Sequence, residues 1–214
     1  MSAAAVCSIL LAVPPHKAPR EGLDLEAAAV ARFQAGEEAA FEDLVSYREA
    51  EVYRLCLRML GNQEDALDAA QEVFLRVYRA LPRFRGEASF RTWVTGIAIN
   101  VCRSSLGSRA ARNRRLTVSL DAADPETGSA LIRSPADPAP DPERAAQGAE
   151  LRGALEHALA SLGPEHREVI LLREMQGMEY DELARVLGCA LGTVKSRLAR
   201  ARGALREALE GLWP

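Results

Sequence analysis

Two apolar helical faces joined by a short turn occupy Tyr180 to Arg206, and they constrain the fold more than any other part of the chain. The residues of the first face have the spacing i, i+3, i+4 and i+7 of one side of an α-helix. Gly188 then supplies the permissive backbone at which a helix ends. The connection from Cys189 to Leu191 is too short for a generous loop between antiparallel helices, so the pattern predicts a helix-turn-helix corner. The first face consists of Tyr180, Leu183, Ala184 and Leu187, and the second of Val194, Leu198, Ala201 and Leu205.

The exposed side of the second predicted helix carries concentrated positive charge. Lys195 to Arg206 contains five cations and no acid, a density that suits a phosphate backbone. A helix also fits the major groove of DNA, where residues near its start reach base edges. The alternative is a solvated basic helix whose charges only complement the negative end of its dipole. Because the charge, the turn and the two apolar faces agree, DNA binding is favoured.

Charge segregation, rather than a basic body, must provide any attraction to DNA, because the net charge of the 214-residue chain is -3. Cations cluster in 103–115 and 195–206, whereas acids concentrate in 64–72 and 121–150. The chain is 48% hydrophobic and 27% charged, which is ordinary for a soluble globular protein.

The four cysteines lie tens of residues apart, without the paired spacing of a zinc site or a dense disulfide framework. Cys56, Cys102 and Cys189 stand in apolar periodic segments, so we expect them in the core and expect neither a metal nor another cofactor. The apolar stretch Ala3 to Val13 is too short to span a bilayer and follows no positive segment. We therefore expect no membrane insertion and a cytoplasmic protein.

Helical periodicity and few alternating runs predict an all-α fold of two small helical domains joined by a flexible linker, with the helix-turn-helix in the C-terminal domain. Asp121 to Pro142 contains five prolines and almost no large apolar residue, which is typical of a linker. A plain spacer is the favoured interpretation; its acids could also repel DNA or thread a positive channel of a partner. The predicted divisions are a disordered leader (1–22), a first domain (23–115), the linker (116–142) and a second domain (143–214). The predicted helices span 25–34, 38–59, 64–80, 90–106, 143–162 and 165–175.

The helix predicted over 64–80 has an exposed polar face opposite an apolar one. Such a face can dock another protein, although spacing alone favours an ordinary solvated surface. The polar face consists of Asp65, Asp68, Gln71, Glu72 and Arg76.

Arginine and aromatic residues alternate in the loop from Arg83 to Trp93, which runs into the next helix with Ser89 as its expected N-cap. Aromatic rings stack on single-stranded bases while guanidinium groups hold phosphates. Phe90 and Trp93 match the helical spacing and are expected in the core, which leaves Phe84 and the arginines as contact candidates. Farther along, Asn100 offers a donor and an acceptor to a base, and the basic tail from Arg103 to Arg115 suits duplex phosphates.

The ordered set DALDAAQEVFLRVYRAL, RFRGEASFRTWVTGIAIN and LGPEHREVILLREMQGMEYDELARVLGCALGTVKSRLARAR resembles bacterial RNA polymerase sigma factors of the extracytoplasmic-function class. The resemblance covers about Leu25 to Leu209, nearly the whole chain. It implies promoter-specific initiation with core RNA polymerase, through its largest-subunit clamp helices and flap, and an anti-sigma partner. Two departures, Ala190 before the recognition helix and Gly96 within the helix before Asn100, affect helix placement rather than contact residues.

The resemblance also implies roles for individual residues. Docking on the clamp helices is implied for Asp68, Gln71, Glu72, Phe74 and Arg76. Melting of the -10 element and capture of a flipped base is implied for Phe84, Arg85, Ile97 and Asn100, with Arg103 beside them on DNA. Recognition of the -35 element is implied for Lys195, Ser196 and Arg200 at or near bases, and for Thr193, Arg197 and Arg202 on phosphates.

The sequence contains no Ser/His/Asp, Cys/His or paired-carboxylate constellation, so it predicts a protein that is not an enzyme. Two other functions compete with the sigma-factor interpretation. A stand-alone helix-turn-helix regulator would bind duplex DNA without polymerase, and a helical interaction or RNA-binding adaptor would show little promoter discrimination.

Overall fold

The computed structural model describes residues 20–116 and 153–210, with side chains for 24–109 and 153–210. Within these ranges every regular element is a helix, and the elements form two compact units. The all-α prediction is therefore confirmed. Apart from Leu116, which still belongs to a helix, the predicted linker lies outside the described residues, as does the predicted leader before residue 20.

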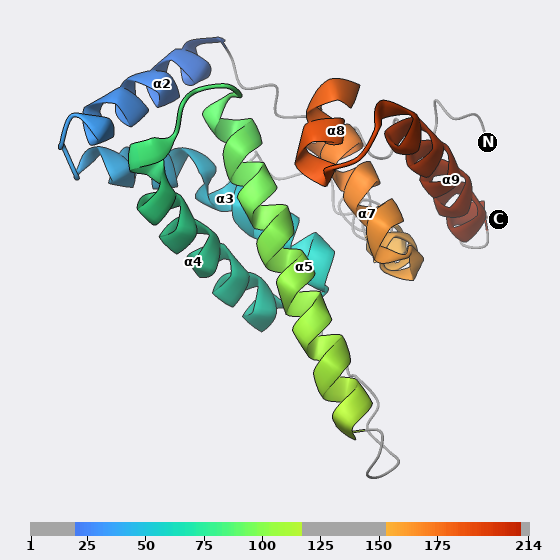
Figure 1. Ribbon diagram of the computed structural model, residues 1–214. Coiled ribbons are helices and arrows are strands. Elements are labelled where there is room, and N and C mark those ends of the chain that lie inside the picture. The colour runs from blue at the N-terminus through green and yellow to red at the C-terminus, as the bar shows by residue number, and fades with distance from the viewer. Residues whose placement is uncertain (1–19, 117–152, 211–214) are drawn as a thin grey trace, which may run out of the picture. The chain divides into compact units, whose positions relative to one another are not determined.

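The first unit is a helical bundle in which α3 contacts α2, α4 and α5, and α4 packs against α5 (Figure 1). Its centre is filled by apolar side chains such as Leu44, Met59, Val73 and Ile99, each fully buried. The long α5 continues beyond the end of α4, as both ribbon views show. The elements are α2 (Arg20–Gln34), α3 (Ala40–Leu60), α4 (Gln63–Ala80), the short 3-10 helix η1 (Leu81–Arg83) and α5 (Phe90–Leu116).

Local capping residues set the helix boundaries of this bundle. Gly61 ends α3 with a φ of 81°, a left-handed conformation that glycine adopts readily, and its N–H donates to the Leu57 carbonyl at 2.8 Å. Asn62 then begins α4, because its side-chain oxygen accepts from the Asp65 N–H at 2.8 Å. Ser89 caps α5 as the sequence predicts, since its hydroxyl accepts from the Thr92 N–H at 3.1 Å.

A buried network of ion pairs joins α2, α3 and α5. Arg48 on α3 pairs with Glu26 on α2 and with Glu51, and Glu51 also pairs with Arg91 on α5 at 2.6 Å. The side chains of Arg48 and Glu26 are only 4% and 5% exposed. Burial raises the pKa of the Glu26 carboxyl above its usual value, even though Arg48 acts in the opposite direction.

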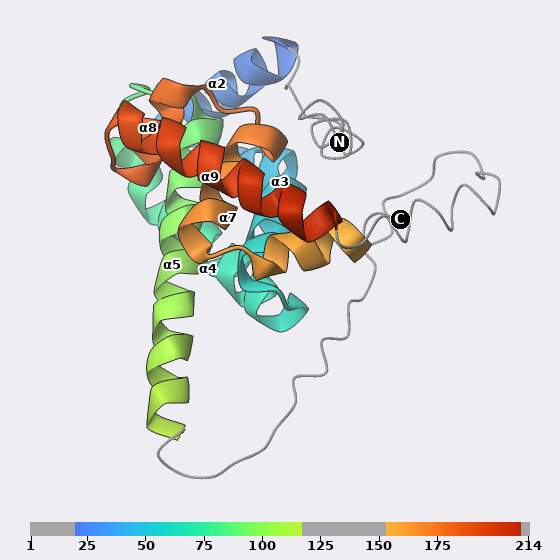
Figure 2. The same ribbon diagram turned by 90° about the vertical axis from the view of Figure 1, so that its right-hand side faces the viewer.

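The second unit places the long α9 against α7 (Figure 2). Fully buried Leu171, Leu198 and Leu205 contribute to its core. The predicted helix over 165–175 is present, but its second half is a π-helical turn. The elements are a helix over 153–161, α7 (Pro164–Ile170), the π-helical turn η2 (Leu171–Met175), α8 (Tyr180–Leu187) and α9 (Leu191–Glu210).

Two arginines hold the connections of the second unit. Arg167 donates to the carbonyls of Leu159 and Ala160 at 2.8 and 2.6 Å, which satisfies acceptors at the end of the helix over 153–161. Arg173 donates to the Met178 carbonyl at 2.6 Å and lies over the Tyr180 ring, 5.0 Å from its centre. The loop into α8 is therefore fixed by side-chain contacts.

The cysteine prediction is correct for two residues and wrong for the third. Cys56 and Cys102 are completely buried in the bundle. Cys189 is half-buried instead, because it stands in the turn between α8 and α9 rather than on an apolar helical face. Among the described helices, none is long and apolar enough to cross a membrane.

Candidate nucleic-acid interfaces

The helix-turn-helix is present where the sequence predicts it. Gly188 follows α8 with a φ of 65°, and α9 begins three residues later. The Ala190 carbonyl accepts from the Thr193 and Val194 N–H groups at 2.9 and 3.1 Å, so the first turn of α9 forms without a side-chain cap from that position. Val194, Leu198 and Leu205 are buried, which fixes the opposite side of α9 toward solvent.

The exposed start of α9 carries the residues expected at DNA bases. Lys195, Ser196 and Arg200 are all exposed. The Ser196 hydroxyl donates to the Thr193 carbonyl at 3.0 Å, which leaves its oxygen able to accept. Within the described residues, neither Lys195 nor Arg200 has an ion-pair or hydrogen-bond partner. Both cations are thus available to an anionic ligand without a competing carboxylate.

The two arginines expected on phosphates are engaged within the unit instead. Arg197 pairs with Glu165 of α7 at 3.0 Å, and its side chain is only 23% exposed. Arg202 donates from Nε and Nη2 to the Glu174 carboxylate at 3.0 and 2.5 Å. These pairs tie α9 to α7 and η2, so phosphate contact by either arginine requires exchange of its partner.

Phe84, Phe90 and Trp93 form one aromatic cluster at the start of α5. The Phe84 ring centre lies 4.7 Å from that of Trp93 and 6.2 Å from that of Phe90. Phe90 is buried, as expected, but Trp93 is only half-buried, so the core prediction holds fully for the first alone. Part of the Trp93 ring is therefore accessible beside Phe84. Helical spacing alone did not predict this exposure.

One face of α5 continues from this cluster. Ile97 is half-buried and Asn100 is exposed, and with Trp93 they have the spacing i, i+4 and i+7. The structure thus brings Phe84, Ile97 and Asn100 to one side of the bundle. Arg85 is exposed in the loop, whereas Arg103 is half-buried and lies off the stripe that Ile97 and Asn100 define.

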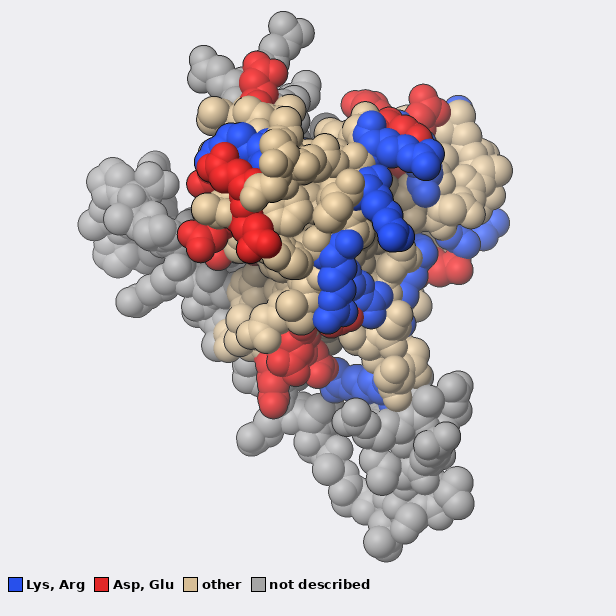
Figure 3. All heavy atoms as spheres, turned by 60° about the vertical axis from the view of Figure 1, so that its left-hand side comes forward, with Lys and Arg blue, Asp and Glu red and all other residues tan. Residues whose placement is uncertain are grey.

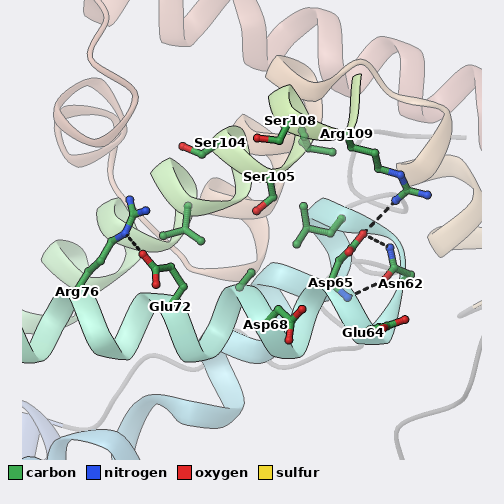
Figure 4. A pocket seen from close by; sticks show the side chains of 14 residues that line it. Asn62, Glu64, Asp65, Asp68, Glu72, Arg76, Ser104, Ser105, Ser108 and Arg109 are labelled. Atoms are coloured by element: carbon green, nitrogen blue, oxygen red, sulfur yellow. Dashed lines mark hydrogen bonds and ion pairs between the residues drawn. The ribbon is translucent and has the colours of Figure 1, made fainter. Parts of the chain in front are cut away.

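A groove between α4 and α5 contains part of the predicted polar face (Figure 4). Asp68, Glu72 and Arg76 line it from α4, and Arg76 donates to Glu72 at 2.7 Å. From α5, Arg109 reaches across to Asp65 at 3.2 Å. The α5 wall combines three serines with Val101 and Leu106, so the groove is mixed in character, with its carboxylate-rich side on α4. The serines are Ser104, Ser105 and Ser108.

The other two residues expected at a protein partner lie outside this groove, and exposed leucines adjoin them. Gln71 is exposed and Phe74 is half-buried. Leu67 and Leu75 stand one turn before and after Gln71 and are 53% and 51% exposed. Two exposed leucines, one turn on either side of Gln71, indicate a contact surface. The spacing of these leucines is visible in the sequence, but only the polar residues of this face and Phe74 were predicted to contact a partner.

Charge is segregated on the surface. Figure 3 shows Lys and Arg side chains gathered in a band on one face, with Asp and Glu in separate clusters. On α4 and the segment that follows it, the exposed cations are Arg76, Arg79, Arg83 and Arg85. Local positive potential therefore exists on a chain whose net charge is -3.

The fold and these surfaces define the class of the protein: it is an all-α protein with a basic helix-turn-helix. Two family models match the chain: "Sigma-70 region 2" over residues 44–112 and "Sigma-70, region 4" over 152–205. The first match falls in the helical bundle and the second in the unit that contains the helix-turn-helix.

Curated relatives match along most of the chain. The RNA polymerase sigma-H factor of Pseudomonas aeruginosa is 34% identical over 183 residues, which cover 86% of this chain and 93% of that protein. The ECF RNA polymerase sigma-E factor of Escherichia coli is 35% identical over 184 residues, with the same coverage of both. The chain therefore belongs to the sigma-70 family, as a sigma factor of the extracytoplasmic-function (ECF) class.

Solved structures share the fold. A sigma factor RpoE in complex with the anti-sigma factor NepR from Bartonella quintana matches with a TM-score of 0.61 and 21% identity, covering 79% of this chain and 96% of that one. CnrH in complex with the cytosolic domain of CnrY matches with a TM-score of 0.58 and 24% identity, covering 88% of this chain and 99% of that one.

Proposed function

We propose that this ECF sigma factor binds core RNA polymerase and directs promoter-specific initiation by contacting the -10 and -35 elements with separate units. The observation that carries the proposal is the presence on one chain of both sigma regions, each with a surface suited to nucleic acid. Its role is that of a dissociable subunit rather than an enzyme. The site of action is the cytoplasm, where core polymerase and promoter DNA are found.

The -35 contact is assigned to the start of α9. Lys195, Ser196 and Arg200 are exposed on the side opposite the buried face, where a helix in the major groove meets base edges. Thr193 lies in the same first turn and can support a phosphate contact. Arg197 and Arg202 reach phosphates only by leaving Glu165 and Glu174, so their contribution to affinity is smaller than that of a cation without a partner.

The -10 contact is assigned to the loop after η1 and the adjoining face of α5. Capture of a base outside the duplex requires a stacking surface and hydrogen-bonding groups on one side. Phe84 with Trp93 supplies the rings, Ile97 an apolar contact and Asn100 the exposed amide. Arg85, exposed in the loop, and Arg103, half-buried and about one turn beyond Asn100, are assigned to the adjoining DNA backbone.

The polymerase contact is assigned to the outer surface of α4. Asp68, Glu72 and Arg76 supply polar groups along the groove, while Gln71 and Phe74 extend the surface beyond it. The exposed Leu67 and Leu75 add the apolar area that a stable protein interface requires. We assign this surface to the clamp helices of the largest subunit, and assign contact with the flap to the second unit.

An anti-sigma factor is the partner proposed for regulation. Two of the solved structures that share this fold are complexes, one of a sigma factor with the anti-sigma factor NepR and one of CnrH with the cytosolic domain of CnrY. An inhibitor of this chain would act by covering the α4 surface, the start of α9 or both.

The test is transcription of fragmented genomic DNA with purified core polymerase and the full-length chain. Discrete start sites that require the chain support the proposal; absence of both a core complex and specific starts overturns it. Lys195→Ala with Arg200→Ala should abolish initiation that depends on the -35 element while core binding remains. Arg54→Ala, an exposed arginine on α3, is the matched control and should leave both intact. DNA binding that is equally tight without polymerase would instead identify a stand-alone regulator.

A further inference from the structure

The loop that carries Phe84 begins at η1, where the chain leaves α4. The Phe84 N–H donates to the Leu81 carbonyl at 3.1 Å and closes this 3-10 turn. Phe84 itself is extended, with φ and ψ of -67° and 123°, and Gly86 adopts a φ of 70°. The Phe84 backbone is thus bonded directly to the turn from which its ring projects.

Gln34, the last residue of α2, adds a second connection from outside the turn. Its amide nitrogen donates to the Leu81 carbonyl at 3.0 Å and to the Phe84 carbonyl at 2.8 Å. A primary amide has two N–H groups, so both bonds form at once and span the turn. These bonds link residues 47 and 50 positions apart.

The helix that carries Gln34 is a firm support for this connection. Ala29, Val30 and Phe33 of α2 are buried against the bundle, and Glu26 pairs with the buried Arg48. At the other end of the loop, the Ser89 cap fixes the start of α5. The loop is therefore held at both ends, and the residues between them are Arg85 to Ala88.

We propose that Gln34 is a positioning residue that holds the turn at Phe84 in the conformation required for base capture. This inference rests on the assignment of Phe84 to the -10 element. Gln34 acts through the two carbonyls of the turn rather than through its own contact with DNA. Without it, the turn keeps its backbone bonds but loses both bonds from Gln34, and the Phe84 ring is less well fixed against Trp93.

The first experiment measures the loop in the full-length protein alone. Gln34→Met preserves side-chain length but removes both donors, whereas Gln34→Lys retains donors. Trypsin cleavage after Arg83 and Arg85, followed by mass spectrometry, should be about five- to tenfold faster in Gln34→Met, the effect of losing roughly 1 kcal/mol of hydrogen bonding. Gln34→Lys should restore slow cleavage after Arg83 and Arg85, which mass spectrometry scores separately from cleavage at the site that the new lysine itself creates. Ala35→Met, an exposed neighbour, is the control and should match the wild type.

The second experiment measures coupling in the holoenzyme. Gln34→Met and Phe84→Ala are tested singly and together for binding to the single-stranded -10 region of a promoter that the wild-type holoenzyme uses. If Gln34 acts through Phe84, each single change weakens binding, by about fivefold for Gln34→Met, and the double change is no weaker than Phe84→Ala alone. Core binding should be unchanged in all three.

The outcomes separate the inference from the function on which it rests. Unchanged trypsin cleavage in Gln34→Met, or additive losses in the double variant, overturns the positioning role. Faster cleavage together with full DNA binding by Phe84→Ala shows instead that Gln34 fixes the loop but the -10 assignment is wrong. An equal loss of core binding and DNA binding in Gln34→Met identifies a general structural role and also overturns the inference.

Discussion

Arg200 and Arg202 are two positions apart on α9, yet their surroundings predict different effects on DNA binding. Arg200 is exposed and has no ion-pair partner within the described residues. Arg202 donates twice to Glu174, whose side chain is only 10% exposed. Replacement of each arginine by alanine in the holoenzyme therefore separates a cation that is free to meet phosphate from one that is engaged in the fold.

The salt dependence of promoter binding provides the expected magnitude. Each phosphate neutralised on duplex DNA contributes about 0.9 to the slope of log K against log salt, or about 3.5-fold in affinity between 50 and 200 mM salt. Arg200 is assigned at or near a base, and as an exposed cation it also neutralises the phosphate beside that base, so Arg200→Ala should lower the slope by up to about 0.9. Arg202→Ala should lower it by less than about 0.3, because phosphate contact by Arg202 would break its bonds to Glu174. Arg202→Ala should instead cost about 1 kcal/mol of folding stability, since the half-exposed pair is partly screened.

Fluorescence anisotropy of labelled promoter DNA, titrated with holoenzyme at several salt concentrations, measures both slopes. Glu174→Gln is the informative companion, because it weakens the pair and should allow Arg202 to contribute more to the slope. Equal slope reductions by Arg200→Ala and Arg202→Ala would refute the reasoning. That result would mean that Arg202 exchanges Glu174 for phosphate on binding at little cost.

Three predictions concern the bundle. Arg48→Met should destabilise it by about 3–5 kcal/mol, because the buried Glu26 loses its partner and the half-buried Glu51 loses one of its two; a thermal melt within 1 kcal/mol of the wild type would contradict this. Burial raises the pKa of Glu26, so ionisation of Glu26 costs more in the folded than in the unfolded state. Protonated Glu26 therefore stabilises the folded state fully below the pKa that Glu26 has in the unfolded chain, near 4.5. This stabilisation is lost as the pH rises through the higher pKa that Glu26 has in the folded protein. Glu26→Gln should therefore be more stable than the wild type at pH 7, with a difference that closes toward pH 4.5 in urea titrations and would stay constant if the pKa were unshifted. Asn62→Ala should cost about 1 kcal/mol through loss of the α4 cap, whereas Asn62→Asp should cost little, as urea titrations of both variants can establish.

Helix positions were the most predictable part of the fold, because their signals are local. Gly61 and Gly188 adopt the left-handed conformation with which helices end, and Ser89 accepts the bond of an N-cap. The expected helix over 64–80 differs from α4 by one residue at its start. Such features depend on neighbours within one turn, so sequence spacing contains them.

The candidate sites were predictable by residue type but not by environment. Sequence spacing placed Trp93 in the core, whereas the structure leaves it partly exposed beside Phe84. Sequence spacing also predicted that Cys189 lies in the core, but Cys189 lies in a turn and is only half-buried. Exposure depends on what packs against a position from elsewhere in the chain, and helical periodicity does not report that.

By itself, the sequence determined an all-helical chain, a basic helix-turn-helix and the family to which the chain belongs. Tertiary structure alone decided which charged side chains are free to meet a ligand. Arg202 and Glu174 are 28 positions apart, and Gln34 reaches carbonyls 47 and 50 positions away. The physical reason is that hydrogen bonds and ion pairs depend on distances of about 3 Å, which packing between helices sets and local propensity does not.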